Sequence, residues 1–504
     1  MGCNKTEKMR LVDLVEAIGD EIKLVIGDTG IEVSGIQCDS RKVSRGDLFV
    51  CIRGYRVDGH SFIDEAISRG CSALVLEDIP NREFPVPVLS VRDTRKALAL
   101  LSSNFFGNPS SKLRLVGITG TNGKTTTAYL IESVMKAAGI NVGVIGTVSY
   151  RFSGKEFPAS QTTPGPVELQ RILSHMVDEG VTHLVMEVSS HALKQDRVLG
   201  CLYDLSIFMN LTRDHLDFHG DLEDYFLSKA RLFWEFTRGK AILNLDDPHS
   251  RRIMDGISGS LGVITYGLDA EGADVSARVL EAGFEGAVFE LLVRGRGAFP
   301  MRISIPGTIY NVYNALAAAT ASLELGIDPG VIAEGLEALK SVPGRFELVD
   351  CGQDFTVVVD YAHTDDALRR VLLAARGLSK GRVITVFGCG GDRDRTKRPL
   401  MGKVAALLSD FFIITSDNPR SEDPMAIISE IMRGVKDVCQ DRSRYDIIAD
   451  RREAIYRAIG MARPGDIIVI AGKGHETYQI IGSEVRHFDD REVAREALSK
   501  GYGG

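Results

Sequence analysis

A glycine-rich stretch between an apolar run and a helical pattern places the strongest constraint on how this chain can fold. Residues 117–126 read GITGTNGKTT; they overlap the end of the strand-like run 113–118 and lead into a helical pattern over 125–138. Glycines let backbone N–H groups turn towards phosphate oxygens, the lysine adds a mobile positive charge, and a threonine offers a hydroxyl to Mg²⁺ at a helix N-terminus. The stretch therefore predicts a βα unit that binds a nucleotide.

The loop differs from the full eight-residue P-loop pattern at one position. That pattern requires glycine where this chain has Ile118, so only the shorter form Gly-Thr-Asn-Gly-Lys-Thr is present. A guanine-reading Asn-Lys-x-Asp motif does not occur, which argues against a GTP-driven switch. The predicted nucleotide-binding residues of the loop are Gly120, Thr121, Asn122, Gly123, Lys124, Thr125 and Thr126.

The length of the chain predicts more than one domain. At 504 residues it exceeds what one hydrophobic core normally supports, and Gly/Pro-containing turns near residues 110 and 343 are plausible boundaries. Beyond the second turn, short apolar runs alternate with helical stretches, which favours a parallel, doubly wound sheet. We predict an α/β fold with an N-terminal domain (1–110), a central P-loop-type domain (111–343) and a C-terminal Rossmann-like domain (344–504).

Charge and cysteine content argue against several classes of protein. The 60 Lys and Arg residues against 68 Asp and Glu residues give a formal charge of −8, which provides no general attraction for nucleic acid or an anionic membrane. The eight cysteines form no CxxC pair or zinc-like spacing, and no run of 18 apolar residues occurs. We expect a cytoplasmic monomer with small-molecule substrates, no nucleic-acid partner and no membrane partner.

Two further residues of the central region suit phosphoryl chemistry. Glu187 ends an apolar run, so we expect it at a strand end that faces the phosphate loop, where it can bind Mg²⁺. Lys229 lies at helical spacing from Tyr225 and Phe233, on an aromatic stripe. An ammonium buried there would be costly unless it were paired or neutralised, and the alternative is that the side chain extends to solvent.

Polar motifs follow four apolar runs of the C-terminal region. They are DYAH at 360–363, GCGGDR at 388–393, DNPR at 417–420 and GKGHE at 472–476. Because the carboxyl ends of the strands in an open parallel sheet form its ligand crevice, we expect the four motifs to converge on one site.

Several of these motifs together resemble the Mur ligases of bacterial cell-wall synthesis, and the folylpolyglutamate synthases share part of the set. The motifs are GTNGKT at 120–125, MEVSSH at 186–191, Asn311 to Asn314 with Ala317 and Ala318, DYAH at 360–363, DSR at 39–41 and GDLF at 46–49. The resemblance implies an ATP-dependent acid–amino-acid ligase of peptidoglycan synthesis. Its N-terminal domain would bind the UDP end of the substrate, and its C-terminal domain would close to bring the amino acid.

The resemblance also implies a mechanism and the residues that carry it. ATP would phosphorylate a carboxylate, an amine would attack the acyl phosphate, and Mg²⁺ and Lys124 would stabilise the negative charge that develops. The implied catalytic residues are Lys124, Glu187, His215 and Lys229. The implied metal ligands are Thr125, Glu187, His215 and Lys229, the last as N6-carboxylysine, a carbamate. Asn314, Arg345 and Asp360 would complete the ATP site.

For the UDP-muramoyl-dipeptide, the resemblance implies two groups of residues. The UDP end would meet Ser40, Tyr55, Arg56 and Val57. The muramoyl-dipeptide would meet Gln161, Thr162, Thr163, Ser189, Gln195 and Arg197, which offer hydroxyls, amides and one cation. Gln161 stands where asparagine is frequent in the family.

The charges of the C-terminal motifs describe the amino acid. Asp417 and Glu476 can accept from ammonium groups, and Arg393 and Arg420 can make forked bonds to carboxylates. A zwitterion with two amines and two carboxylates satisfies this set, and meso-diaminopimelate is that molecule. Lysine lacks the distal carboxylate and would leave an arginine unpaired, at a cost of about 1–3 kcal/mol. The predicted diaminopimelate-binding residues are Arg393, Asp417, Asn418, Pro419, Arg420, Gly472 and Glu476.

Three alternatives stay open at this point. Two are enzymes, a lysine-adding Mur ligase and a folylpolyglutamate synthase-like ligase, of which the second has no use for Arg393 and Arg420. The third is a P-loop regulatory or scaffold protein that binds a nucleotide without ligation. Phosphate release that depends on both the muramoyl-dipeptide and an amino acid would distinguish a ligase from such a protein.

Overall fold

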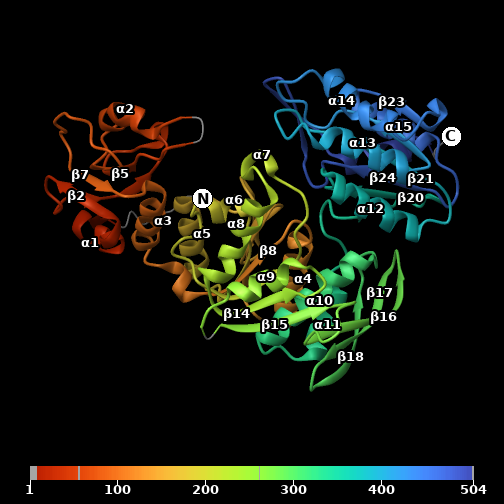
Figure 1. The fold of residues 1–504 in the computed structure, drawn as a ribbon, viewed down its shortest axis with the longest axis horizontal. Coiled ribbons are helices and arrows are strands. Elements are labelled where there is room, and N and C mark those ends of the chain that lie inside the picture. The colour runs from red at the N-terminus through yellow and green to blue at the C-terminus, as the bar shows by residue number, and fades with distance from the viewer. Residues whose placement is uncertain (1–7, 55–56, 260, 502–504) are drawn as a thin grey trace.

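The protein folds into three lobes that follow one another along the chain (Figure 1). The structure, a computed structural model, describes residues 8–54, 57–259 and 261–501. Within these residues, the lobes contain large sheets of five, eleven and six strands. The predicted α/β class is confirmed. The strands of each large sheet lie within one of the ranges 1–110, 111–343 and 344–504, which we retain as the proposed domains.

The N-terminal lobe is built on a sheet that is parallel except at one edge. The strands, in spatial order, are β2 (Ile22–Ile26), β7 (Val88–Val91), β6 (Ala73–Leu76), β5 (Asp47–Val50) and β4 (Gly35–Gln37), with a separate pair β1 (Met9–Arg10) and β3 (Glu32–Val33). The helices are α1 (Leu11–Val15), α2 (Ile63–Ser68) and α3 (Thr94–Phe105). Helix α3 begins where the Asp93 carboxylate accepts from the N–H groups of Arg95 and Lys96, as an N-cap does.

The central sheet joins a parallel core to an antiparallel extension. In spatial order its strands are β11 (Lys155–Pro158), β10 (Ser149–Phe152), β9 (Val142–Ile145), β12 (His183–Glu187), β8 (Arg114–Thr119), β13 (Tyr203–Phe208), β14 (Thr237–Asn244), β15 (Gly262–Gly267), β16 (Val275–Gly283), β17 (Gly286–Val293) and β18 (Gly297–Ile303). The pairing is parallel from β9 to β16 and antiparallel beyond both ends of that run. The sequence analysis did not predict the β16–β18 extension.

Helices cover both faces of the central sheet. One apolar cluster packs the sheet against α4 (Lys124–Ala137), α10 (Ile309–Glu324) and α11 (Pro329–Ala338). The other packs it against α5 (Pro166–Asp178), α6 (Ser190–Lys194), α8 (Leu222–Trp234) and α9 (His249–Gly256), and the short α7 (Leu216–His219) precedes α8. The buried strands β8 and β12 therefore carry their carboxyl ends to one fixed edge, where α4 begins.

The C-terminal lobe has the predicted doubly wound sheet. In spatial order the strands are β19 (Glu347–Leu348), β20 (Thr356–Asp360), β24 (Ile467–Ala471), β21 (Val383–Phe387), β22 (Phe411–Ile414) and β23 (Tyr445–Ile447), all parallel except β19. Helices α12 (Asp365–Leu378), α13 (Lys397–Leu408) and α14 (Pro424–Lys436) cover one face, and α15 (Arg451–Gly460) and α16 (Asp490–Gly501) cover the other. A hairpin of β25 (Tyr478–Ile481) and β26 (Glu484–His487) follows β24.

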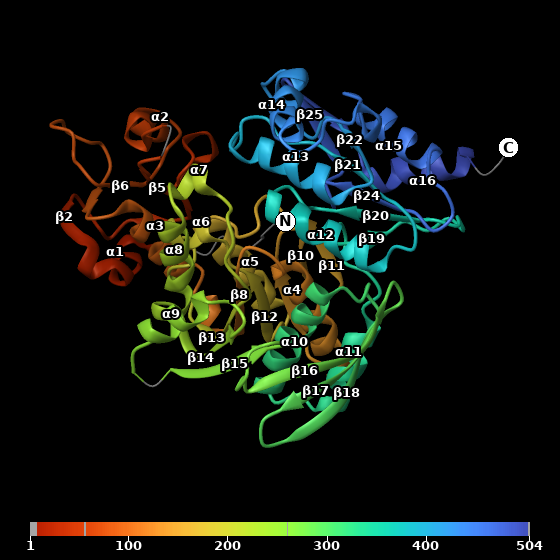
Figure 2. The ribbon, with the colours of Figure 1, turned by 45° about the vertical axis from the view of Figure 1, so that its right-hand side comes forward.

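The central and C-terminal lobes touch through the tip of the β16–β17 hairpin. Figures 1 and 2 both show this hairpin extending from the central sheet towards α12. At its tip Phe284 packs against the apolar cluster of the C-terminal lobe. The antiparallel extension is therefore a contact between the two lobes as well as an edge of the sheet.

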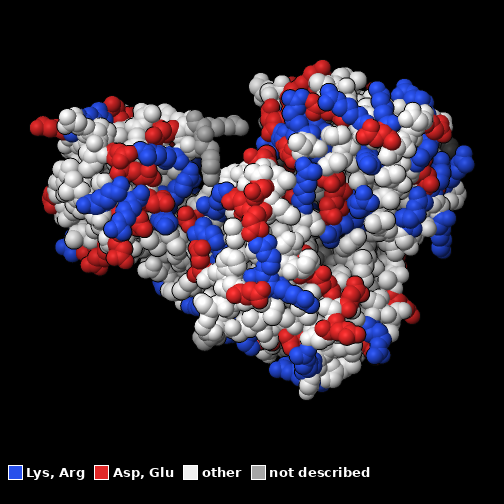
Figure 3. All heavy atoms as spheres, in the orientation of Figure 1, with Lys and Arg blue, Asp and Glu red and all other residues white. Residues whose placement is uncertain are grey.

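Basic and acidic side chains alternate over the face of the molecule shown in Figure 3, where neither sign dominates a large area. An anionic substrate that approaches this face meets no broad basic surface, so its attraction has to come from groups inside a local site. In the part of the chain that the structure describes, no helix has both the length and the apolar character needed to cross a membrane.

Candidate active site

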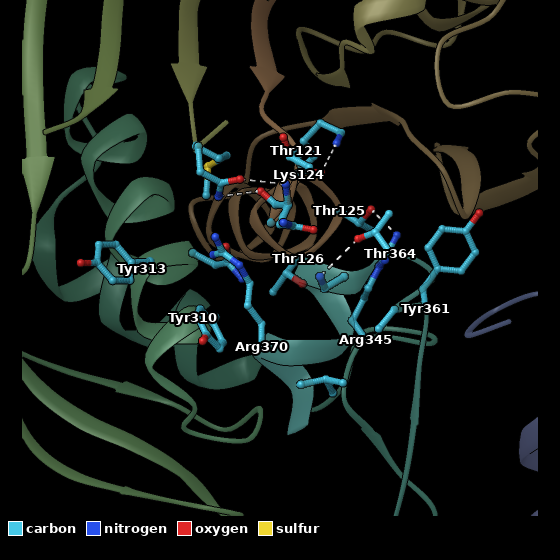
Figure 4. A pocket seen from close by; sticks show the side chains of 18 of the residues that line it. Thr121, Lys124, Thr125, Thr126, Tyr310, Tyr313, Arg345, Tyr361, Thr364 and Arg370 are labelled. Atoms are coloured by element: carbon cyan, nitrogen blue, oxygen red, sulfur yellow. Dashed lines mark hydrogen bonds between the residues drawn. The ribbon is translucent and has the colours of Figure 1, made fainter. Parts of the chain in front are cut away.

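A cavity of about 470 Å³ lies between the central and C-terminal lobes, around the N-terminus of α4. In Figure 4, Arg345 and Arg370 extend from the C-terminal lobe towards the phosphate loop, while Tyr310 and Tyr313 belong to α10 of the central lobe. Two lobes thus build one cavity, and a change in their arrangement would change its walls.

The phosphate loop joins β8 to α4 as the sequence predicted. Gly120 and Gly123 adopt positive φ angles of 147° and 91°. A Cβ atom on Gly120 would lie 2.7 Å from Met209 Cβ, and one on Gly123 would lie 2.5 Å from Asn314 Oδ1. Glycine is therefore required at both positions by backbone conformation and by space.

The departure at Ile118 has a structural reason. Ile118 is fully buried within β8 and pairs in register with Glu187 of β12 and Ile207 of β13. Since this position belongs to the strand, the loop proper begins only at Gly120 and needs no glycine at 118.

The side chain of Lys124 lies over the loop. Its Nζ donates to the carbonyl oxygens of Gly120, at 2.7 Å, and Thr121, at 2.9 Å. Burial lowers the pKa of this lysine, while the negative charges of Glu187 and Asp214 act in the opposite direction. The positive charge of Arg345 also lowers this pKa, so cations gather beside the loop, an arrangement that suits an anionic ligand.

Glu187 faces the phosphate loop from the end of β12, as predicted. Its Oε2 accepts from the hydroxyls of Thr125, at 3.0 Å, and Thr147, at 2.9 Å, and its Oε1 accepts from the Thr147 N–H at 2.9 Å. A hydroxyl and a carboxylate at a helix N-terminus fit Mg²⁺, which usually completes its shell with water and substrate phosphates. Among the described residues, no three His, Cys, Asp or Glu side chains gather as a metal cluster.

Lys229 is buried on the aromatic stripe, and the alternative in which its side chain extends to solvent is wrong. It is 1 % exposed, its Nζ donates to the Gly120 carbonyl at 3.0 Å, and the same atom lies 4.5 Å from the centre of the Tyr225 ring. Burial and the positive charge of Lys124 lower the pKa of Lys229 well below its ordinary value. Both effects disfavour the charged ammonium form of Lys229 beside the phosphate loop.

His215 lies near Lys229 in a turn that precedes α7. Its backbone is left-handed, with φ of 54°, and its Nε2 lies 3.3 Å from the Asp214 carboxylate. Its ring is 4.7 Å from that of His191 and 6.2 Å from that of Tyr225. Burial lowers the pKa of His215, with Asp214 opposing, so a neutral imidazole is available as a ligand.

The residues assigned to the muramoyl-dipeptide lie together at one side of the cavity. Arg197 donates to the Gln161 side chain, to Gln195 Oε1 at 2.7 Å and to the Thr163 carbonyl at 3.0 Å. The Ser189 N–H donates to the Thr163 hydroxyl at 3.0 Å. Thr162 and Thr147 hydroxyls are 3.1 Å apart, so this group adjoins Glu187 through Thr147.

The two described residues assigned to the UDP end, Ser40 and Val57, do not line this cavity. Ser40 is buried in the N-terminal lobe, in a 3₁₀ turn (Ser40–Lys42), and its hydroxyl donates to Glu65 at 2.7 Å. Val57 is 56 % exposed. Tyr55 and Arg56 lie outside the described residues.

The other side of the cavity contains residues that the sequence analysis missed. The Arg370 guanidinium lies 5.4 Å from the centre of the Tyr310 ring, and Tyr313 also lines the cavity. On the same side Asn314, which was predicted, accepts from the Thr127 hydroxyl at 3.5 Å. A flat ring and a guanidinium suit a nucleobase. Tyr310 directly precedes the Asn311 to Asn314 motif and Tyr313 lies within it, which was the available signal, but Arg370 is brought in from another lobe.

Arg345 and Asp360 reach the site from the C-terminal lobe. Arg345 Nη2 donates to the Thr125 hydroxyl at 3.1 Å, and its Nε is buried with no hydrogen-bond partner in the described part of the chain. Asp360 accepts from the N–H groups of Phe346, at 2.7 Å, and Ala362, at 2.8 Å, and burial raises its pKa. Arg345 thus has an unused donor beside the phosphate loop, whereas Asp360 fixes the turn that carries Arg345.

A carboxylate at the start of α12 joins the two lobes. Asp366 Oδ2 accepts from Asn122 of the phosphate loop at 3.2 Å, from the Thr212 hydroxyl at 2.9 Å and from Arg370 at 2.8 Å. The role of Asp366 is not predictable from the sequence, because its partners Asn122 and Thr212 are far away along the chain. The phosphate loop is therefore in direct contact with the C-terminal lobe.

The DNPR and GKGHE motifs meet at the carboxyl edge of the C-terminal sheet. The Asn418 amide donates to Glu476 Oε2 at 2.8 Å, and a Cβ atom on Gly472 would lie 2.5 Å from Asp417 Oδ2. Only glycine therefore leaves room for the Asp417 carboxylate. Burial and the charge of Asp417 raise the pKa of Glu476.

The GCGGDR motif reaches the same edge. The Arg420 guanidinium donates to the Gly391 carbonyl at 2.8 Å, and a Cβ atom on Gly391 would lie 1.8 Å from the Pro419 carbonyl oxygen. Both Arg393 and Arg420 oppose the rise that burial causes in the pKa of Tyr478, so both cations lie near this phenol. Three motifs thus share one region, whereas the fourth, DYAH, also lines the cavity at α4.

Comparisons with known proteins cover almost the whole chain. Family models match as follows: Mur ligase family, catalytic domain, over residues 32–106; Mur ligase middle domain over 118–322; Mur ligase, glutamate ligase domain, over 344–474. The UDP-N-acetylmuramoyl-L-alanyl-D-glutamate--2,6-diaminopimelate ligase 1 of Clostridium acetobutylicum is 46% identical, covering 97% of this chain and 99% of the relative. The corresponding ligase of Solibacter usitatus is 49% identical over 94% of each chain.

A solved structure gives the same result in three dimensions. A structure of UDP-N-acetylmuramoyl-L-alanyl-D-glutamate--2,6-diaminopimelate ligase matches with a TM-score of 0.69 and 33% identity, covering 98% of this chain and 100% of that one. The similarity therefore extends over all three lobes.

Proposed function

This chain belongs to the Mur ligase family, and from this premise we infer that it joins meso-diaminopimelate to UDP-N-acetylmuramoyl-L-alanyl-D-glutamate in an ATP-dependent reaction of peptidoglycan synthesis. The observation that carries the inference is the meeting of the DNPR and GKGHE motifs at a sheet edge next to a nucleotide-type cavity. Full-length relatives that carry this name support it. The enzyme would work in the cytoplasm as a monomer, with no nucleic-acid or membrane partner.

The phosphate loop would activate the D-glutamyl carboxylate by phosphoryl transfer from ATP. Lys124 and the N-terminus of α4 would neutralise the charge on the transferred group, and Arg345 would add a second cation from the C-terminal lobe. Thr125 and Glu187 would hold Mg²⁺, which supplies Lewis-acid stabilisation of the phosphate oxygens. Asn314, Tyr310 and Arg370 would hold the nucleoside.

Lys229 and His215 would serve a second Mg²⁺ position. The buried amine of Lys229, whose pKa is lowered, is suited to conversion to a carbamate. The carbamate would place an anionic oxygen ligand where an ammonium would be costly to bury. His215 offers a neutral imidazole nearby. Both assignments rest on burial, charge and the family resemblance.

The muramoyl-dipeptide would lie along the Arg197 group described above, with its UDP end reaching the N-terminal lobe. Arg197 provides a cation for a carboxylate or phosphate, and Ser189 and Thr162 provide hydroxyls. Ser40, Tyr55, Arg56 and Val57 remain the proposed UDP contacts.

The function can be tested with purified protein and a panel of amino acids. We expect phosphate release from ATP to require Mg²⁺, UDP-N-acetylmuramoyl-L-alanyl-D-glutamate and meso-diaminopimelate, with lysine and glutamate much poorer acceptors. Release at the same rate without either substrate would instead favour a nucleotide-binding regulatory protein. A preference for lysine would favour the lysine-adding alternative, and use of a folate with glutamate would favour a folylpolyglutamate synthase-like ligase.

Replacing Arg420 tests the choice of amino acid. In Arg420→Ala, kcat/KM for diaminopimelate should fall roughly tenfold to a few hundredfold, because the distal carboxylate loses a charge-assisted partner. The KM for ATP should stay within about twofold. The measurement is phosphate release at varied diaminopimelate and varied lysine. An unchanged preference for diaminopimelate over lysine would contradict the role of Arg420.

A further inference from the structure

The amino-acid end of the site contains a lysine to which the chemistry above gives no task. Lys473 directly follows Gly472 and its side chain is fully buried. Its Nζ lies 3.2 Å from Glu476 Oε2 and 3.4 Å from Asn418 Oδ1, and it also donates to the Tyr478 carbonyl. Because this ammonium is buried and has three defined partners, it belongs to the packed structure of the sheet edge and is not a solvated surface charge.

The lysine lies where two carboxylates have to be accommodated together. Asp417 is 8 % exposed, and its negative charge adds to burial in raising the pKa of Glu476, while Lys473 and the Asn418 amide act against that rise. Two buried carboxylates without a fixed cation tend to share a proton, so that only one remains anionic.

Besides Lys473, the groups around Glu476 include an arginine paired with another carboxylate and two phenols, and the Arg393 and Arg420 cations lie near one of those phenols, Tyr478. The Arg451 guanidinium forms a fully buried pair with Asp490 at 2.7 Å and donates to the Ala471 carbonyl at 3.0 Å. The phenols of Tyr361 and Tyr478 have raised pKa values because of burial. In the described part of the chain, the cation within ion-pair distance of Glu476 is Lys473.

We propose that Lys473 is a positioning residue that keeps Glu476 anionic and joined to Asn418, so that Asp417 and Glu476 can both accept from the ammonium groups of the incoming amino acid. The inference rests on the proposed function, because the ligand is the diamino acid. Lys473 would then not touch the substrate and would act through Glu476. Selection of a substrate with two ammonium groups would depend on this buried cation as well as on Arg393 and Arg420.

Loss of Lys473 should weaken diaminopimelate binding more at low pH than at high pH. Without Lys473, burial and Asp417 raise the pKa of Glu476 further, so the carboxyl stays protonated up to a higher pH. In the protonated form it can no longer accept from an ammonium through both of its oxygen atoms. Raising the pH ionises Glu476 again and restores binding. A loss caused only by disturbed packing would not recover with pH.

The experiment compares Lys473→Met with the unmodified enzyme at each pH from 6.5 to 9. The ratio of their KM values for diaminopimelate cancels the ionisation of the substrate itself. We expect this ratio to be about ten to a hundred at pH 6.5 and to fall towards one as the pH rises. The ratio of KM values for ATP should stay within about twofold at every pH.

Two further variants isolate the role of Glu476. Glu476→Gln should raise KM for diaminopimelate at all pH values, and Lys473→Met combined with Glu476→Gln should behave like Glu476→Gln alone, with no added pH dependence. Lys436→Met, an exposed lysine of α14, is the matched control and should leave KM unchanged. If Lys473→Met does not fold, Lys473→Gln removes the same charge and keeps a donor for the Tyr478 carbonyl.

The outcomes separate this inference from the proposed function. A KM ratio for diaminopimelate that is constant with pH, or an equal rise in KM for ATP, would overturn the role of Lys473 while the ligase activity stands. If the unmodified enzyme releases no phosphate in response to diaminopimelate, the proposed function itself fails and the inference fails with it.

Discussion

Lys124→Met is expected to lower kcat for diaminopimelate-dependent phosphate release by about 10³-fold. The Nζ of Lys124 lies over the phosphate loop, 2.7 Å from the Gly120 carbonyl, at the start of α4. Methionine keeps most of the side-chain volume but removes the charge that would neutralise the transferred phosphoryl group. The loss should therefore appear in kcat more than in the KM for diaminopimelate.

The control for this variant lies on the same helix. Lys136 is in the last turn of α4, pairs with Glu132 at 2.7 Å and is largely exposed. Lys136→Met should change kcat by less than about twofold, because Lys136 lies far along the helix from the loop and the buried Glu132 keeps its pair with Arg151 at 2.6 Å. Near-normal kcat in Lys124→Met, measured by phosphate release with all three substrates present, would remove Lys124 from the catalytic step.

Short-range patterns allowed much of the central site to be predicted from the sequence. The phosphate loop is a local motif between a strand and a helix, and Glu187 ends a buried apolar run, so position along the chain was enough to place both at one sheet edge. Helical spacing placed Lys229 on the stripe of Tyr225 and Phe233 but left open whether its side chain is buried, which the structure shows it to be. In each case the neighbours that matter lie within one element or at its end.

The residues that were missed depend on contacts between distant elements. Asp366 acquires its role only because the C-terminal lobe sits against Asn122 and Thr212, and Arg370 because α12 lies beside Tyr310. No spacing within the sequence reports such pairings. The β16–β18 extension was missed for a similar reason, because its contact with the other lobe depends on Phe284 reaching the apolar cluster there.

The four C-terminal motifs lie along one sheet edge but line different parts of the site. All four follow strands of one parallel sheet, as predicted, but the DYAH motif lies at the end of β20, beside the hinge turn that carries Arg345. It therefore lines the nucleotide cavity, while DNPR and GKGHE meet each other farther along the edge. One sheet edge thus carries the residues proposed for the amino acid and also lines the cavity at the phosphate loop.

Lys229→Met is expected to lower kcat by roughly 10²–10³-fold while the protein stays folded. The side chain is fully surrounded, and its Nζ contacts the Gly120 carbonyl at 3.0 Å, so methionine can fill the space but cannot react with CO₂. In the carbamate, the neutral amine nitrogen bonds to the carbon of CO₂ and releases one proton, which gives an anionic oxygen ligand where an ammonium would be unfavourable. Activity should be measured with saturating substrates and Mg²⁺.

Depleting CO₂ separates a carbamate from a simple packing role for Lys229. Activity of the unmodified enzyme should fall in CO₂-free buffer and recover when bicarbonate is added, and a carbamate carbon should be visible by NMR after labelling with ¹³CO₂. Lys229→Met should respond to neither treatment. Lys240→Met is the control, because Lys240 pairs with Glu324 at the surface of the same lobe, and this variant should keep both normal activity and the CO₂ response. If the unmodified enzyme is indifferent to CO₂ while Lys229→Met is inactive, Lys229 acts as an amine and the carbamate assignment is wrong.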